Sequence, residues 1–151
     1  MNRRQTAPQQ WLIIEAQPSD DVWRSVRRLP LGTGILLLAD LPPSERRRLR
    51  SLTTARALTI AEEAGGAAAR VHHARELRRA MLALTPLIFL SPIHPTRSHP
   101  EWRALPRMRA AALARLGRRR LFALGGMNAK RYAKIARLGF IGWAGISAFR
   151  T

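Results

Sequence analysis

Three short apolar segments in the second half of this chain each run into a loop of small or polar residues. Residues 87–90 are followed by residues 91–100, which read SPIHPTRSHP. Residues 122–126 and residues 141–148 also begin apolar and end in small residues, Gly-Gly and Ser-Ala respectively. A loop so rich in proline and polar side chains does not continue a buried strand. The pattern predicts a β/α fold in which loops at the carboxyl ends of the strands form one anion site.

The whole chain alternates short apolar segments with helical patterns, as parallel β/α units do. We expect strands over residues 10–15, 35–39, 70–73, 87–90, 120–124 and 141–146, and helices over residues 20–28, 45–57, 74–83, 106–117 and 129–138. Residues 58–63 fit a strand or a helix. Ser19 and Asn128 are the expected caps of the helices that follow them. Residues 1–151 are therefore predicted to form a single α/β domain, with about seven parallel strands that curl toward a barrel.

Composition excludes several classes of protein. The chain has no cysteine, so it has no disulfide framework and no thiolate nucleophile or metal ligand. Its longest apolar runs, such as residues 35–39, are far too short to span a bilayer. The arginines near the N-terminus are not followed by the apolar core of a secretory signal. We therefore expect a cytoplasmic protein without a membrane partner.

The net charge of +18 is the most extreme property of the composition. Of the 27 basic residues, only Lys130 and Lys134 are lysines, and arginines cluster at residues 46–48, 78–79 and 118–120. One interpretation is a nucleic-acid surface. The other is a set of solvated helix faces in a protein from a GC-rich genome, and we favour it because no aromatic residues interleave with the clusters. A positive field would in either case attract small phosphorylated molecules.

Four segments carry a more specific pattern. They are RVHHAREL at residues 70–77, FLSPIHPTRSHP at residues 89–100, ALGGM at residues 123–127 and GWAGISA at residues 142–148. In their order and approximate spacing they resemble segments of the thiamine phosphate synthases and their thiazole tautomerase relatives, from the fifth to the eighth strand. The resemblance implies a TIM-type (β/α) barrel of the thiamine phosphate synthase kind, here shortened.

The same resemblance implies a phosphate site after the last three strands. Its residues here are Thr96, Ser98, Gly125, Gly126, Ile146 and Ser147. Two of them offer hydroxyl groups and the other four correspond to backbone amides in the family. The physics agrees, because glycine lets a backbone approach an anion closely and barrels often hold a phosphate beside strands seven and eight. His72, His94 and Arg97 are further candidates for contact with a substrate.

A function in thiamine biosynthesis follows from the resemblance. The synthases are transferases that join hydroxymethylpyrimidine diphosphate to a thiazole phosphate, using magnesium, and release diphosphate. We therefore expect this chain to bind a thiazole phosphate or thiamine phosphate, and to complete the transfer if the diphosphate half of the site is present. Two alternatives stay open, namely a non-catalytic relative that only binds a phosphorylated ligand, and a basic nucleic-acid-binding protein.

The chain also departs from the family pattern. Barrels of this type usually need about 200 to 250 residues, and the shortfall lies around residues 58–70, where the family keeps magnesium and diphosphate ligands. Only Asp40, Glu62 and Glu63 are candidates to replace those metal ligands. The tautomerases carry a catalytic histidine where Pro92 stands, which argues against that activity. A shortened barrel leaves strand edges exposed, and this predicts a homodimer.

Overall fold

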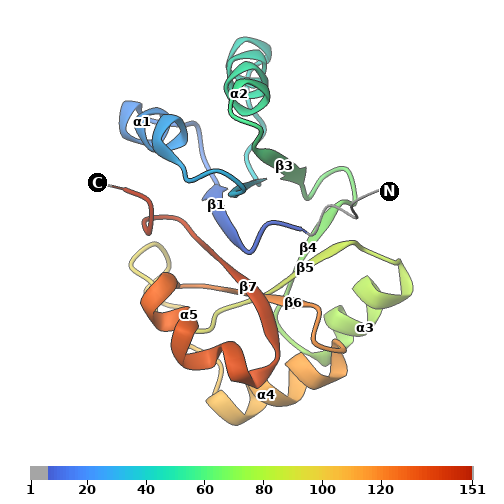
Figure 1. Cartoon of the computed structure of the whole chain (residues 1–151). Coiled ribbons are helices and arrows are strands. Elements are labelled where there is room, and N and C mark those ends of the chain that lie inside the picture. Colours follow the sequence, from blue (N-terminus) through green and yellow to red (C-terminus); the bar gives the residue numbers. More distant parts are fainter. Residues whose placement is uncertain (1–6, 151) are drawn as a thin grey trace, which may run out of the picture.

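The structure, a computed structural model, describes residues 7–150 as seven strands interleaved with helices (Figure 1). The strands are β1 (Gln10–Ile14), β2 (Gly34–Leu37), β3 (Thr59–Glu62), β4 (Ala68–Val71), β5 (Leu87–Leu90), β6 (Leu121–Leu124) and β7 (Phe140–Gly145). The helices are α1 (Asp20–Arg28), α2 (Pro43–Ala55), α3 (Ala74–Leu82), α4 (Arg107–Leu116), α5 (Ala129–Ile135) and the short 3₁₀ helix η1 (Ala136–Leu138).

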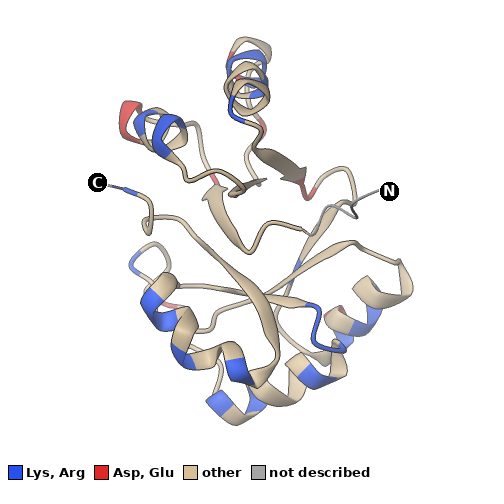
Figure 2. Ribbon diagram, in the orientation of Figure 1, with Lys and Arg blue, Asp and Glu red and all other residues tan. Residues whose placement is uncertain are grey.

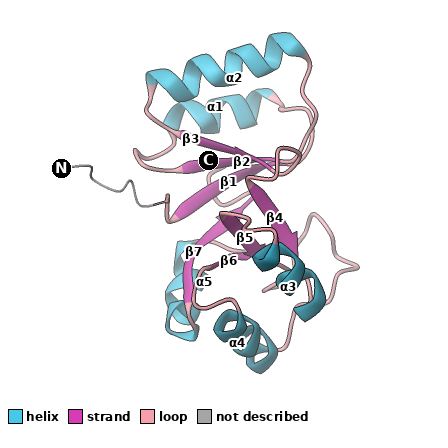
Figure 3. Cartoon of the chain, turned by 90° about the vertical axis from the view of Figure 1, so that its right-hand side faces the viewer, coloured by secondary structure: helices cyan, strands magenta, loops and turns pink. Residues whose placement is uncertain are grey.

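All seven strands belong to one parallel sheet, in the order β3-β2-β1-β7-β6-β5-β4. The first strand pairs with the last one, and the sheet curls until it is nearly closed into a barrel. Helices α1 and α2 lie outside one part of it, and α3, α4 and α5 lie outside the other (Figure 3). The predicted α/β class and the shortened, TIM-like arrangement of parallel strands are confirmed.

The barrel is shortened between β3 and β4. Every other pair of consecutive strands is separated by a helix, whereas residues 63–67 link these two strands by a turn alone. The amide of Gly66 donates a hydrogen bond to the carbonyl of Glu63 over 3.1 Å, and the Glu63 carboxylate pairs with Arg70 over 2.8 Å. β3 and β4 therefore form the two edges of the sheet, and the wall of the barrel is open there.

Three aromatic side chains fill the inside of the curled sheet. The rings of Phe89 and Phe122 stack with centroids 5.0 Å apart, and Trp11 meets them edge-on at 5.8 and 5.9 Å. All three are almost completely buried, and the indole nitrogen of Trp11 donates to the carbonyl of Pro8 over 2.8 Å. Gly34 of the neighbouring strand leaves room for the indole, because a Cβ there would lie 2.2 Å from the ring.

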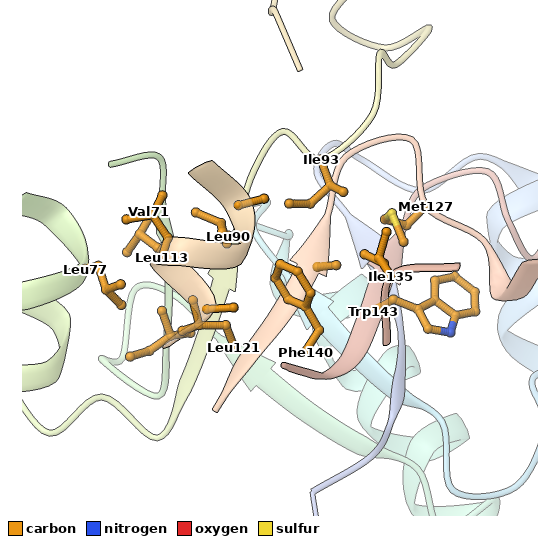
Figure 4. Close-up of a cluster of buried hydrophobic side chains, with 14 of the residues drawn as sticks. Val71, Leu77, Leu90, Ile93, Leu113, Leu121, Met127, Ile135, Phe140 and Trp143 are labelled. Atoms are coloured by element: carbon orange, nitrogen blue, oxygen red, sulfur yellow. The ribbon is translucent and has the colours of Figure 1, made fainter. Parts of the chain in front are cut away.

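Two further cores lie between the sheet and the helices. One joins α1 and α2 to β1 and β2 and contains Trp23, Val26, Leu49, Leu12 and Ile35. The other joins α3, α4 and α5 to β4–β7 and contains Leu77, Leu113, Ile135, Leu90 and Phe140 (Figure 4). Each helix therefore buries one apolar stripe on the outside of the sheet, as β/α units require.

The expected elements are present, with small shifts at their ends. Residues 58–63, left open between strand and helix, form β3. The strand expected over residues 70–73 runs instead from Ala68 to Val71. Asn128 caps α5, since its side-chain oxygen accepts from the Arg131 amide over 2.9 Å. Ser19 stands at the N-cap of α1, but its side chain makes no capping hydrogen bond.

The helices of the described part are short. The longest, α2, has 13 residues. None of the helices within residues 7–150 combines the length and the apolar character that a membrane span requires.

Candidate phosphate-binding site

A pocket of about 970 Å³ opens at the carboxyl ends of the strands. Ile13 and Leu124 line its floor, and they follow Trp11 and Phe122 by two positions on the same inner face of the sheet. The loops after β5, β6 and β7 form its walls. All six residues predicted for the phosphate line it, namely Thr96, Ser98, Gly125, Gly126, Ile146 and Ser147. The fold thus brings the three predicted loops together, while their binding of a phosphate stays a prediction.

The loop after β5, residues 91–106, is held against the neighbouring strand end. The amide of Ile93 donates to the carbonyl of Leu124 over 2.9 Å, so pairing continues past the end of the strand. Within the loop, the hydroxyl oxygen of Thr96 accepts from the amide of Ser98 over 3.2 Å. These bonds hold the two predicted hydroxyl groups beside the pocket.

The two glycines after β6 occupy positions that no other residue would fit. Gly125 and Gly126 have φ angles of +101° and +60°. A Cβ at Gly125 would lie 2.9 Å from the Cα of Pro92, and one at Gly126 would lie 2.5 Å from the carbonyl oxygen of Pro95. Glycine adopts such angles without strain and leaves the backbone bare. A ligand in the pocket therefore meets main chain at this wall.

The third wall follows β7. Ile146 and Ser147 line the pocket, and the amide of Arg150 donates to the Ser147 carbonyl over 3.1 Å in a turn. Phe149 stacks on Trp143 with ring centroids 5.3 Å apart and an interplanar angle of 7°. The stacked rings anchor the end of the described chain to β7 and thereby position this wall.

The charges around the pocket favour an anion. Among the described residues, Arg70, Arg97, Arg131 and Arg150 line it together with a single acid, Glu15. Arg131 also donates to the carbonyl of Gly126, which places its guanidinium at the glycine wall. The Nε atom of Arg70 also forms an ion pair with the Glu63 carboxylate, at a distance of 2.8 Å. Guanidinium groups form strong, charge-assisted hydrogen bonds with phosphate, so this set suits a phosphorylated ligand.

Two ring systems and a carboxylate also line the pocket, namely His99, Trp102 and Glu15. His99 stacks on Trp102 with centroids 3.9 Å apart and an interplanar angle of 9°. The Nε2 atom of His99 lies 3.4 Å from a carboxylate oxygen of Glu15, which follows β1. This contact joins the first strand end to the loop after β5. The stacked rings of His99 and Trp102 give the pocket a flat aromatic surface.

His94, a predicted contact, does not line the pocket. Its amide donates to the carbonyl of Gly125 over 3.0 Å, and its side chain is half-buried behind the glycines. Burial lowers the pKa of this imidazole below its ordinary value of 6.5, and the charges of Arg131 and Lys134 lower it further. The neutral form of this imidazole is thereby favoured, and the backbone of His94 holds the loop against Gly125.

This lowered pKa predicts a loss of stability in mild acid. The unfolded chain takes up the His94 proton near pH 6.5, whereas the folded chain takes it up only at lower pH. The stabilisation is thus complete above about pH 6.5 and disappears as the pH falls through the folded-state pKa. Melting temperatures measured between about pH 7 and 5 are expected to fall less steeply for His94→Gln than for the unaltered protein. Parallel curves for the two proteins would contradict the assignment.

The other predicted contacts divide between the pocket and its surroundings. Arg97 lines the pocket. His72 does not, because β4 ends before it and its exposed ring lies 3.2 Å from Glu76 and edge-on to Trp102. The neighbouring His73 caps α3 by accepting a hydrogen bond from the Glu76 amide.

The three candidate metal ligands do not form a magnesium site. Arg46 bridges Asp40 and Glu62, and Arg70 pairs with Glu63. None of the three acids lines the pocket, and residues 7–150 contain no cluster of three or more acids and histidines that could hold a metal ion. Magnesium is bound by carboxylates together with phosphate oxygens. The residues present therefore do not fit the metal that the family resemblance implies.

Several pocket residues were not anticipated from sequence. Glu15 follows Ile13 by two positions on an inward-facing strand, so its place at the mouth could be derived from alternation. Arg131 stands three residues after the cap at Asn128, which puts it in the first turn beside the glycines. Trp102 carries no such signal, because the long loop that contains it has no periodicity.

Comparisons with known proteins do not assign a family. No protein-family model matches this chain, and a search of curated proteins finds no match. The likeness to thiamine phosphate synthases consequently depends on four short segments and on the pocket to which residues of all four contribute.

Proposed function

We propose that this protein binds a small phosphorylated ligand of thiamine biosynthesis, a thiazole phosphate or thiamine phosphate. One observation carries the proposal, since the six residues taken from the resemblance line one arginine-rich pocket. In this proposal the phosphate lies against Gly125 and Gly126, where Arg131 balances its charge. The ring of the ligand lies toward His99 and Trp102, whose stacked surface suits a flat heteroaromatic group.

The positions of the candidate metal ligands favour a protein that binds the ligand without catalysing the transfer. In the family reaction, magnesium stabilises the diphosphate that leaves the pyrimidine. Asp40 and Glu62 pair with Arg46, Glu63 pairs with Arg70, and none of the three acids lines the pocket. We therefore expect the protein to retain the phosphate half of the synthase site and to lack the transferase step.

Calorimetric titration tests the binding. Thiamine phosphate is expected to bind with a Kd of about 1 mM or lower, and thiamine without its phosphate at least about tenfold more weakly. Arg131→Ala should weaken thiamine phosphate binding about 10- to 100-fold, because a hydrogen bond to a charged group is lost. Arg47→Ala, an exposed change on α2, is the control and should have no effect. Equal affinity for the phosphorylated and free ligands would refute the phosphate site.

Growth of a thiamine-requiring synthase mutant tests the transferase step. Expression of this chain is expected not to restore growth, while the purified protein still binds thiamine phosphate. Restored growth would show that the chain completes the reaction without the family's magnesium ligands, and the binding-only proposal would then be wrong.

The open edges of the sheet support a homodimer as part of this proposal. Within the described chain β3 pairs only with β2, and β4 pairs only with β5. Unpaired edges are usually covered in native proteins, and a second copy is the partner we propose. Light scattering should give a mass of twice the 17.0 kDa of one chain. A monomeric mass at working concentration would exclude the dimer.

A further inference from the structure

The two parts of the chain differ sharply in charge. All nine acidic residues lie between Glu15 and Glu101. From residue 102 onward the chain has no acid, but it has twelve basic residues: Arg103, Arg107, Arg109, Arg115, Arg118, Arg119, Arg120, Lys130, Arg131, Lys134, Arg137 and Arg150. Figure 2 shows the result, since α4, α5 and the loop between α4 and β6 carry blue without red. One side of the molecule is therefore an unbalanced positive surface.

Six exposed residues represent this surface, which we call the basic face: Arg109, Arg115, Arg119, Lys130, Lys134 and Arg137. They come from α4, the loop after it, α5 and η1. These elements are neighbours, because α4 packs beside η1 and the side chain of Arg119 lies against Gly139. Arg131 is left out because it lines the pocket. The cations thus form one continuous field on the outside of the barrel.

Several arginines elsewhere in the described part of the molecule have structural partners, whereas those of the basic face have no acidic partner. Arg46 bridges two acids, Arg48 lies over the ring of Trp23, and Arg56 donates to carbonyl groups at the end of α1. Within residues 7–150, no side chain of the basic face lies within 4.0 Å of a carboxylate. Their charge is available to an external anion.

We propose that the basic face binds the phosphate backbone of double-stranded nucleic acid without reading its sequence. This inference is independent of the pocket and its ligand. Charge complementarity is the argument, since repeated phosphates are what an extended field of guanidinium and ammonium groups matches best. The sequence clusters, taken alone, favoured solvated faces. The structure changes the balance, because it unites these six cations, which have no acidic partner, on one side.

The residues between the cations select a duplex over other polyanions. Ala112, Ala129 and Ala133 are exposed there, so phosphates meet no bulky side chain. Insertion into a membrane would need several large apolar residues, and α4 exposes only Met108. A single strand would need exposed aromatic rings on which its bases could stack. Tyr132 of α5 does not offer one, because it is half-buried and its hydroxyl donates a hydrogen bond to the carbonyl of Phe140.

The size of the face sets the expected number of contacts. The ten residues of α4 extend over about 15 Å. A duplex presents about one charge per 1.7 Å, and roughly half of these face one side, which gives about four phosphate contacts. The logarithm of the binding constant should then fall against the logarithm of salt concentration with a slope of about −4.

Fluorescence anisotropy with labelled duplexes of random sequence tests the proposal. Both DNA and RNA duplexes are expected to bind. Between about 50 and 200 mM salt, the logarithm of the binding constant should fall with the slope of about −4. The variant R115E/R119E/K134E should lose at least about 100-fold in affinity. The matched control R28E/R47E/R50E makes the same change in net charge on α1 and α2, where all three side chains are exposed. It should lose less than about tenfold.

Circular dichroism of both variants confirms that each is folded before binding is compared. If only the DNA duplex or only the RNA duplex binds, that duplex is identified as the natural partner and the proposal is supported. A flat salt response, equal losses in the two variants, or tighter binding of single strands than of duplexes would overturn it. Binding to anionic phosphatidylserine vesicles without binding to either duplex would overturn it as well.

Discussion

Gly34→Ala is expected to destabilise the protein by about 3 kcal/mol or more, a large part of the stability of a domain this size. The added Cβ would lie 2.2 to 2.5 Å from three atoms of the Trp11 ring. The indole cannot retreat, because Phe89 and Phe122 hold its edges inside the sheet. The strain must then separate β1 from β2. Urea denaturation followed by circular dichroism measures the loss.

Gly65→Ala is the matched control. Nothing lies within 4 Å of a Cβ at Gly65, and the residue is exposed in the turn between β3 and β4. Its stability should stay within about 0.5 kcal/mol of the unaltered protein. Equal effects at the two glycines would show that the loss comes from glycine's backbone freedom and not from the packed indole.

Phe122→Ala is expected to cost about 3 to 5 kcal/mol, because it opens a cavity in the middle of the barrel. Phe122 is 1% exposed and contacts both Phe89 and Trp11. Phe122 also belongs to the same buried cluster as Leu124, which lines the pocket floor. Binding of thiamine phosphate by any folded fraction should therefore weaken along with the melting temperature.

Phe149→Ala provides the comparison for the same substitution. Phe149 also belongs to an aromatic stack, but it is only partly buried and lies near the end of the chain. Its loss should cost about 1 kcal/mol, while ligand binding weakens because the third wall of the pocket loses its anchor. A larger destabilisation from Phe149 than from Phe122 would contradict the described core.

The order of the elements was predictable because local patterns encode it. Residues 87–90 are apolar between breakers, and the strand β5 has those bounds. Asn128 is a strong local cap, and it makes the expected bond. The strand expected over residues 70–73 was misplaced by two residues. The expected strand included His73 because this residue has an extended backbone. His73 is extended as the N-cap of α3, not as part of the sheet.

The candidate site was predictable where it consists of backbone and small side chains. Gly125, Gly126 and Ser147 are conspicuous after apolar strands, and parallel strands bring such ends to one rim. The places of the histidines are harder to predict from sequence, because they depend on the residue at which a strand ends and on which loop covers that end. His72 faces Trp102 outside the pocket, and His94 lies behind the glycines.

The amino-acid sequence alone determined the α/β class, the succession of strands and helices, and the three loops at the carboxyl ends, since each follows from contacts between near neighbours. Only the tertiary structure decided that the link between β3 and β4 lacks a helix and leaves the barrel open. It also decided that Arg46 and Arg70 occupy the three candidate metal ligands, and that the cations of α4 and α5 share one face. These features depend on distances between residues far apart in the chain, which the curvature of the sheet sets and local pattern does not encode.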